Sequence, residues 1–372
     1  YLHSLCVRTH SECKLKMDNK KNIRISDIAR LAGVSVGTVD RILHNRGRVS
    51  KEKRACVERV LKEVNYKPNL MARSLAMKKT INIIALIPSF KTGEYWEDIN
   101  RGISCAETEL DLYNVRIERI LFNQYDEFSF NKAVDTLLKK EFQGILIGTL
   151  FGEPVVRLSL ELDNRKIPYV YVDSNIIGQN CLAYFGTNSY DGGYIAAKLL
   201  MEKIPENSDI LISRIMRECK NCSTQICNRE KGFIDYLTKC DYQGQIYYCD
   251  LSIDDPLYNT QVLDEIFNST GKYIKGAVLF NSVCYVLADY LSRHREKQIK
   301  LVGYDLLARN IEHLLEGNIV NLIAQRPEMQ GYNGIKALAK YLVTGECVPK
   351  VNYMPIDILI SENIQYYNNQ SI

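Results

Sequence analysis

The 372-residue sequence has little of what several protein classes require. It holds one tryptophan and five histidines, and no run of about 18 apolar residues is long enough to cross a bilayer as a helix. The opening residues lack the continuous apolar region of a secretory signal, so we expect the protein to stay in the cytoplasm, with no membrane partner. Because Met17 precedes the first organised segment, we expect residues 1–22 to be a disordered or non-native tail, with residues 1–16 as upstream sequence.

Motifs for catalysis and metal binding are equally scarce. We find no Walker loop, no GxSxG and no HExxH, and the histidines show no catalytic spacing, so an enzyme is disfavoured. The twelve cysteines are scattered and are expected to be reduced. Cys219 and Cys222, with Cys227 following, have zinc-ligand or redox spacing but no matching second pair, so a surface loop is favoured over a metal or redox role. We expect no cofactor and no metal.

Charge is distributed unevenly along the chain. The net charge is +4, but residues 17–80 hold 16 Lys/Arg and 6 Asp/Glu, whereas residues 81–372 hold 29 and 37. A basic head on an acidic body is typical of a protein that presents one end to a polyanion. The alternative is a basic face that is merely solvated.

Apolar spacing predicts three short helices in the head. The first covers 26–33, with Ser26 as its N-cap and Gly33 as its stop, and the second covers 36–45 after Ser35. The third begins after Ser50, so the head has the order of a helix-turn-helix. The side chains expected at apolar helical positions are Ile28, Ala29, Leu31, Ala32, Val39, Ile42, Leu43, Val57, Val60, Leu61 and Val64.

Residues 28–75, IARLAGVSVGTVDRILHNRGRVSKEKRACVERVLKEVNYKPNLMARSL, strongly resemble the head of the LacI/GalR family of transcription regulators. The match is long and gapless, so it is specific. It implies a DNA-binding helix-turn-helix at 23–67 and a hinge at 68–80 that forms a short helix in the minor groove. It also implies a homodimer on double-stranded, pseudo-palindromic operator DNA.

The resemblance also implies which head residues meet the DNA. Val36 and Gly37 would face base edges, and Arg41 is the main expected reader because arginine can donate two hydrogen bonds to guanine. The positions expected at phosphates are Ser35, Thr38, Asn45 and Ser50. Ser35 and Ser50 would also be wanted as helix caps in a protein that never met DNA.

Three hinge residues complete the implied DNA contacts: Ala72, Arg73 and Leu75. Leu75 matches the residue that wedges between base pairs, and an apolar wedge of this kind kinks the duplex. The alternative is a linker leucine tucked against the body.

From residue 81 onward, short runs rich in Ile and Val alternate with helical segments. Such strands are buried on both faces, which predicts α/β architecture in two doubly wound lobes. The body resembles periplasmic sugar-binding proteins, in which ligand lies between lobes. We expect one lobe from 81–187 plus 308–326 and the other from 188–307 plus 327–372.

Polar and aromatic residues at predicted strand ends are the candidates for a small-molecule effector site, since ligands bind at the carboxyl ends of strands. These residues also cap helices, so each assignment has a structural alternative. A sugar or sugar derivative is the first expected effector and a nucleoside-like compound the second. The rival function is a solute-binding protein without a DNA role. The candidate residues are Tyr95, Trp96, Asp173, Arg229, Asn281, Asp305 and Gln325.

Overall fold

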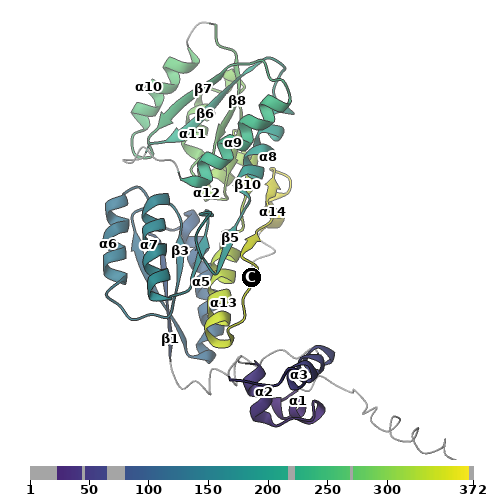
Figure 1. Cartoon of the computed structure of the whole chain (residues 1–372). Coiled ribbons are helices and arrows are strands. Elements are labelled where there is room, and N and C mark those ends of the chain that lie inside the picture. The colour runs from purple at the N-terminus through teal and green to yellow at the C-terminus, as the bar shows by residue number, and fades with distance from the viewer. Residues whose placement is uncertain (1–22, 44–46, 65–79, 217–222, 269–270, 368–372) are drawn as a thin grey trace, which may run out of the picture. The chain divides into compact units, whose positions relative to one another are not determined.

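The computed structural model describes residues 23–43, 47–64, 80–216, 223–268 and 271–367 (Figure 1). The chain divides into two units, residues 1–69 and 70–372, which we describe separately. The predicted tail at 1–22 and the predicted hinge up to residue 79 lie outside the described residues. Within them, no helix is long and apolar enough to span a membrane.

The head unit contains the three predicted helices, α1 (Ile25–Leu31), α2 (Val36–Leu43) and α3 (Lys51–Glu63). Ser35 and Ser50 cap α2 and α3, because their hydroxyls accept hydrogen bonds from the backbone N–H groups of Thr38 and Lys53. Gly33 ends the first helix with φ of +64°, which favours glycine. The buried residues of the head are Ile28, Ala29, Ala32, Thr38, Val39, Ile42, Val57 and Val60.

Two details of the predicted head are wrong. Ser26 is not the N-cap of α1, because the helix begins one residue earlier and Asp27 accepts a hydrogen bond from the backbone N–H of Arg24. Leu31 is 58% exposed, because Ile28 and Ala29 already fill the inward face of this two-turn helix.

The first lobe of the body is built on a six-stranded parallel sheet in the order β11-β5-β4-β3-β1-β2. Its long apolar strands are buried on both faces, as their unbroken Ile and Val content predicts. The strands are β1 (Ile81–Pro88), β2 (Val115–Phe122), β3 (Gly144–Gly148), β4 (Tyr169–Val172), β5 (Ala183–Gly186) and β11 (Val351–Tyr353). The helices are α5 (Tyr95–Leu110), η1 (Asp111–Tyr113), α6 (Glu127–Leu137), α7 (Gly152–Arg165) and α13 (Pro327–Thr344).

The second lobe repeats this plan with the order β12-β10-β9-β8-β6-β7, in which only β12 is antiparallel to its neighbour. Its strands are β6 (Asp209–Ile215), β7 (Ile246–Leu251), β8 (Ile274–Leu279), β9 (Lys300–Tyr304), β10 (Asn321–Ala324) and β12 (Asp357–Leu359). Its helices are α8 (Ser189–Met201), α9 (Thr224–Lys239), α10 (Pro256–Phe267), α11 (Tyr285–Arg293), η2 (Arg295–Lys297), α12 (Ala308–Leu315) and α14 (Ile364–Tyr367).

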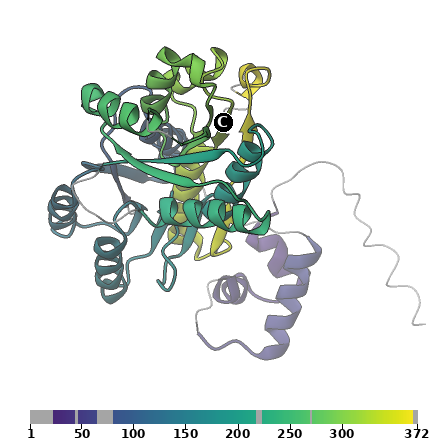
Figure 2. The ribbon, with the colours of Figure 1, turned by 90° about the horizontal axis from the view of Figure 1, so that it is seen from above.

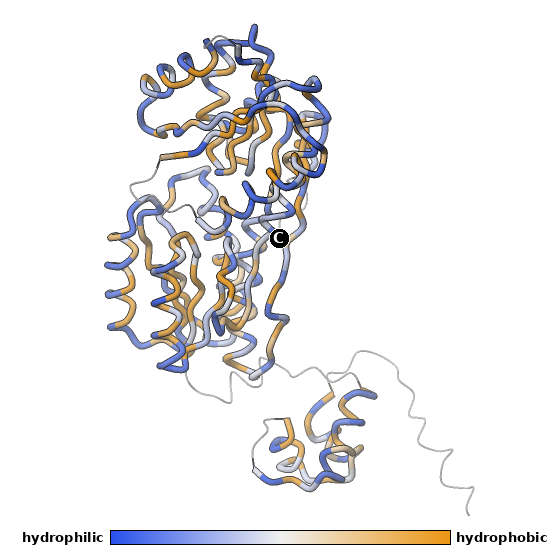
Figure 3. Tube along the Cα trace, turned by 45° about the horizontal axis from the view of Figure 1, so that its top comes forward, coloured by the Kyte–Doolittle hydropathy of each residue, from blue (hydrophilic) through white to orange (hydrophobic). Residues whose placement is uncertain are grey.

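Helices cover both faces of each sheet (Figures 1 and 2). In the first lobe, α5 and α13 pack together on the face opposite α6 and α7. Figure 3 shows the strands as predominantly hydrophobic and the outer helices as alternately hydrophobic and hydrophilic. The doubly wound α/β class expected from the sequence is therefore confirmed for both lobes.

The chain crosses between the lobes three times: between β5 and α8, between β10 and α13, and between β11 and β12. The predicted lobe composition is therefore wrong toward the C-terminus. Residues 308–326 contribute α12 and β10 to the second lobe, and residues 327–353 contribute α13 and β11 to the first. No local pattern indicates this exchange, because α13 has the same amphipathic pattern whichever sheet it covers.

Two close helix crossings fix the lobes internally. A Cβ on Gly193 of α8 would collide with the carbonyl group of Arg229 on α9, and a Cβ on Gly331 of α13 would collide with the carbonyl of Ile99 on α5. Glycine at these positions lets the paired helices approach closely. The first crossing fixes the backbone from which Arg229 projects.

Candidate functional site

Three of the predicted site residues follow directly after strands whose carboxyl ends meet at the junction of the lobes. Asp173 follows β4, Asp305 follows β9 and Gln325 follows β10. Asp173 and Asp305 have φ of +75° and +66°, a left-handed backbone conformation that turns the chain sharply at the strand end. All three side chains are buried.

Gln325 is the centre of a buried hydrogen-bond network. Its amide nitrogen donates to both carboxylate oxygens of Asp305, at 2.8 and 3.1 Å, and its amide oxygen accepts from Arg229. The same oxygen accepts from the hydroxyl of Thr187 at 3.2 Å and from the amide of Gln225 at 3.1 Å. Four segments far apart in the sequence are thereby brought together, as the topology predicts.

Arg229 lies fully inside the protein with a relative exposure of 1%. It donates to the carbonyl of Phe280 at 2.6 Å and to Gln325, and its guanidinium lies 4.0 Å from the ring centroid of Tyr304. An arginine with this burial requires paired charges and rigid partners. It faces the two buried carboxylates, Asp173 and Asp305.

Burial raises the pKa of both carboxyls, Asp173 and Asp305, and the positive charge of Arg229 opposes the rise. Each carboxyl also accepts hydrogen bonds that favour its charged form, from Tyr95 and Gln225 at Asp173 and from Gln325 at Asp305. Burial is the larger effect at both residues. The charged centre of the network therefore consists of two carboxyl groups and one guanidinium.

Tyr95 belongs to this network, whereas Trp96 does not. The Tyr95 hydroxyl bonds to the carboxylate of Asp173 and accepts from the amide of Gln330 at 3.3 Å, and burial raises its pKa well above the usual value. Trp96 is 3% exposed and its ring lies against Gly148 of β3, where a Cβ would meet it at 2.9 Å. The structure therefore places Trp96 in the helix packing that the sequence left open as its alternative role.

Asn281 is only partly buried, and its neighbour Ser282 bonds to the carboxylate of Asp305 in its place. The predicted strand end is displaced by two residues, because β8 ends at Leu279 and Phe280 follows it. Five of the seven candidates thus join the buried network, and within the described residues no hydrogen bond joins Trp96 or Asn281 to it: the five are Tyr95, Asp173, Arg229, Asp305 and Gln325.

Three residues of the network were not predicted from the sequence: Thr187, Gln225 and Gln330. Gln225, from the second lobe, donates to the carboxylate of Asp173 in the first lobe at 2.9 Å. Gln330 accepts from the backbone N–H of Asp173 at 3.0 Å and donates to the carbonyl of Gln325. Thr187 follows the end of β5 directly, so its position could have been found from the strand pattern. The two glutamines lie in the first turns of α9 and α13, where no local pattern distinguishes them from other polar helix residues.

The two lobes are closed on one another at this junction. Besides the bond from Gln225 to Asp173, Leu307 of the second lobe is buried in the apolar core of the first. Partly buried Val283 and Tyr285 of the second lobe pack against the same core. Residues on both sides of the junction can therefore move relative to one another only by breaking polar and apolar contacts together.

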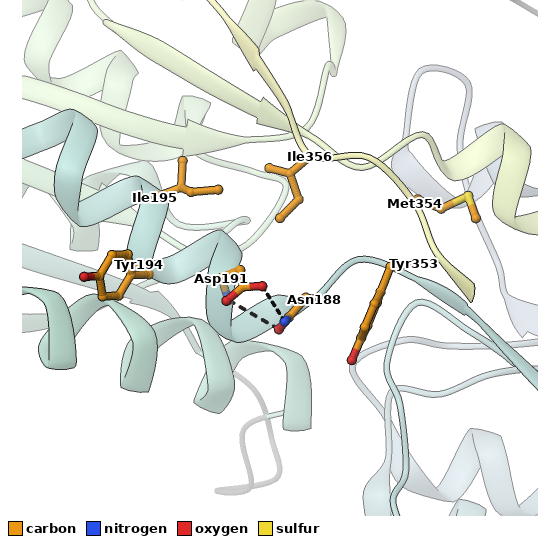
Figure 4. Close-up of a pocket in the computed structure, with 7 residues that line it drawn as sticks. All are labelled: Asn188, Asp191, Tyr194, Ile195, Tyr353, Met354 and Ile356. Atoms are coloured by element: carbon orange, nitrogen blue, oxygen red, sulfur yellow. Dashed lines mark hydrogen bonds between the residues drawn. The ribbon is translucent and has the colours of Figure 1, made fainter. Parts of the chain in front are cut away.

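A separate hollow of about 470 Å³ lies outside this network (Figure 4). Asn188 and Asp191 bond to one another on one side of it, at the start of α8. None of the predicted effector residues lines it, and its lining is Asn188, Asp191, Tyr194, Ile195, Tyr353, Met354 and Ile356.

The head presents part of its predicted DNA-reading surface to solvent. Val36, Gly37 and Arg41 are exposed on α2, and the Nε of Arg41 donates to the carbonyl of Gly37 at 3.0 Å. Thr38 is instead buried, and its hydroxyl bonds to that of Ser35 at 2.9 Å. The predicted contacts Asn45, Ala72, Arg73 and Leu75 lie outside the described residues.

Of the three cysteines in the predicted cluster, one lies in the described part of the chain. Cys219 and Cys222 lie outside the described residues, and Cys227 is exposed on α9. Within the described ranges, no group of three or more His, Cys, Asp or Glu side chains is arranged to hold a metal ion.

Comparison with known proteins assigns each part of the chain. Residues 24–69 match bacterial regulatory proteins of the lacI family, and residues 84–346 match the periplasmic binding protein domain. A putative LacI transcriptional regulator from Bacteroides fragilis is 34% identical, with a TM-score of 0.73 over 78% of this chain and 100% of that one. The chain belongs to the LacI family.

The chain is also similar to a transcriptional repressor in sequence and to a solute-binding protein in fold. The HTH-type transcriptional repressor PurR of Proteus mirabilis is 26% identical over 296 residues, covering 76% of this chain and 80% of the relative. The fold is shared with a solute-binding protein from Burkholderia graminis in complex with D-arabinose, at 18% identity and a TM-score of 0.68 over 78% of this chain and 98% of that one.

Proposed function

We propose that this LacI-family protein is a sequence-specific DNA-binding transcription repressor whose operator affinity is set by a small sugar or sugar derivative held between the lobes. The observation that carries the proposal is the Gln325 network, which joins carboxylates, amides and a guanidinium from both lobes in a chain that also has a lacI-type head. Such groups are suited to hydroxyl-rich ligands. A fold relative with D-arabinose bound supports a sugar.

The effector would act by changing the lobe closure. A ligand that competes with Gln225 for Asp173 has a different free energy in the open and closed states, which is the condition for shifting the equilibrium between them. In a dimer, that shift would alter the separation of the two heads and hence operator affinity. We infer that the protein has no catalytic role and acts in the cytoplasm, where operator DNA lies.

We further propose a homodimer that pairs along the edge strands β2 and β7. Large apolar side chains are exposed on these strands or at the start of the helix that follows each, and α6 and α10 lie on the same side of the two lobes in Figure 1. Phe128 is 75% exposed at the start of α6 and Leu257 is 78% exposed at the start of α10. The full exposed set is Leu121, Phe128, Tyr248 and Leu257.

Light scattering coupled to size exclusion tests the dimer. Leu257→Lys and Phe128→Lys should each shift the protein toward monomer, whereas the control Ile177→Lys, on an 88% exposed residue of the loop between β4 and β5, should not. A wild-type protein that runs as a monomer at micromolar concentration contradicts the dimer.

Fluorescence anisotropy with DNA fragments from upstream of the protein's own and neighbouring genes tests the regulator. We expect specific binding that weakens steeply with salt, because lysine and arginine contacts to phosphate release counterions. Addition of the cognate sugar should change that affinity. A protein that binds sugar but no DNA fragment at low salt would instead be a solute-binding protein.

A further inference from the structure

The interior of the lobe junction carries more acid than base. Asp173 and Asp305 are each 3% exposed, and in the described part of the chain the guanidinium that faces both is that of Arg229. Further out, Asp98 and Glu328 share Arg101, which bonds to both. Asp98 acts electrostatically on Asp305 through the same region. The buried carboxyl of Asp305 therefore has a further carboxyl, Asp98, in its electrostatic surroundings, and Arg101 already pairs with Asp98.

Arg229 is already bonded within the protein through both of its terminal nitrogens. One terminal nitrogen donates to the carbonyl of Phe280 and the other to Gln325, and the ring of Tyr304 covers one face of the guanidinium. Only its Nε lacks a hydrogen-bond partner among the described residues. A phosphate or carboxylate is bound well by an arginine that can present two parallel N–H groups, and Arg229 already uses one N–H of each terminal nitrogen on Phe280 and Gln325.

The other donors and acceptors suit neutral groups. Gln225, Gln330 and Thr187 supply amides and a hydroxyl, and the buried hydroxyl of Tyr304 has no hydrogen-bond partner among the residues that the structure describes. The carboxylates of Asp173 and Asp305 accept hydrogen bonds, which a ligand's hydroxyl or ammonium group can donate. A ligand anion would bring a third negative charge into a buried space with one compensating cation.

We infer that Asp173 and Asp305 make the site selective for uncharged or amine-bearing sugars and exclude phosphorylated and carboxylated ones. This inference rests on the proposed effector function of the same site. It narrows the effector to free sugars and amino sugars. Burial raises the pKa of both carboxyls, and protonation of one would cancel its charge without supplying the cation that an anionic ligand needs.

Isothermal titration calorimetry on the full chain with matched probes tests the inference. The pairs are D-arabinose with D-arabinose 5-phosphate, and D-glucose and D-glucosamine with D-glucuronate and D-glucose 6-phosphate. We expect binding by at least one neutral or amine-bearing probe, and its anionic analogue should bind at least about 100-fold more weakly, as expected for an uncompensated buried charge.

Asparagine variants of Asp173 and Asp305 test whether these two residues cause the selectivity. Asp305→Asn and Asp173→Asn each remove one negative charge and keep an acceptor oxygen, so the preference for the neutral probe should shrink about tenfold. Asp241→Asn, on an exposed turn outside the junction, should leave it unchanged. Thermal unfolding confirms that each variant is folded, and the wild-type comparison stands even if one variant is not.

The outcomes separate the inference from the function on which it rests. An anionic probe that binds as tightly as its neutral analogue overturns the charge selectivity and leaves the effector function standing. An unchanged preference in both folded asparagine variants overturns the assignment to Asp173 and Asp305. Absence of binding by every probe at millimolar concentration overturns the sugar-effector function together with the selectivity.

Discussion

Arg326 and Asp357 form a two-bond ion pair that ties together two of the three crossovers between the lobes. The Arg326 Nε lies 2.7 Å from one carboxylate oxygen of Asp357, and a terminal nitrogen lies 3.0 Å from the other. Arg326 follows Gln325 of the network directly and has φ of +51°, so its backbone turns the two neighbouring side chains in different directions. Because Gln325 and Arg326 are neighbours in the chain, we expect a movement of Gln325 to displace the ion pair between Arg326 and Asp357.

Asp357→Asn should weaken this pair and lower the free energy of unfolding by about 1–3 kcal/mol, because a bidentate pair of partly buried charges is worth more than an exposed one. Urea unfolding measures the change. Glu161→Gln, which breaks the i,i+4 pair with Arg165 on α7, is the control and should cost less than about 0.5 kcal/mol. Equal losses in both variants contradict a special role for the crossover pair.

Gln225→Glu should open the junction. The new carboxylate would stand where the Gln225 amide now donates to Asp173, so attraction across the lobes becomes repulsion between like charges. Small-angle X-ray scattering should show a larger radius of gyration than in the wild type. Gln225→Met loses the hydrogen bonds without adding a charge, so its radius of gyration should lie between those of the wild type and Gln225→Glu. A glutamate variant as closed as the wild type argues that the apolar contacts of Leu307 alone hold the lobes together.

The sequence was informative where local pattern and chain order suffice. The bounds of β1 and β2 and the caps Ser35 and Ser50 could be predicted, because each depends on neighbouring residues only. Strand-end residues Asp173, Asp305 and Gln325 could be grouped because parallel strands end at one edge.

The rest of the site depends on packing between segments distant in sequence. The place of α13 in the first lobe is fixed by its contact with α5, more than 200 residues earlier. Gln225 and Gln330 become site residues only through that long-range arrangement, and Trp96 turns away from the site because Gly148 leaves room for its ring. No single-sequence pattern reports such contacts.

Asp305 and Asp289 should contribute to the pH dependence of stability with opposite signs. Burial raises the pKa of Asp305, so the folded protein keeps this proton at pH values where the unfolded chain has lost it. Asp305 therefore favours the fold below the usual aspartate pKa of about 4, and this contribution is lost as pH rises. Asp305→Asn should lose less stability than the wild type on going from about pH 4 to about pH 8.

Asp289 provides the opposite case. Burial acts against its ionisation, but hydrogen bonds and charge from His313 and Arg309 lower its pKa overall, so its contribution is present above the usual value and lost as pH falls. Asp289→Asn should therefore reduce the loss of unfolding free energy as the pH falls below the usual aspartate pKa. Urea unfolding across the pH range measures both variants, and parallel curves for Asp305→Asn and wild type would refute the role of burial at Asp305.

Arg41→Ala should relax base selection at one operator position and weaken specific binding by about 1–3 kcal/mol, the usual value of a bidentate contact to guanine. Arg41 is exposed, and its Nε donates to the carbonyl of Gly37, which keeps the side chain on the face of α2 that is predicted to read the bases. Arg59→Ala, an exposed cation on α3, is the control. Anisotropy against a panel of single-base operator variants distinguishes them, and unchanged selectivity in Arg41→Ala would be incompatible with direct reading.

The late return of α13 to the first lobe also bears on how the protein is made. Strands β1 to β5 leave the ribosome early, but the helix that covers them with α5 follows only after the whole run from α8 to β10 has been synthesised. The growing chain can complete most of the second lobe while one apolar face of the first is covered by α5 but still lacks α13. Chaperone demand during translation should therefore centre on the first lobe, and it should end when Pro327–Thr344 emerges.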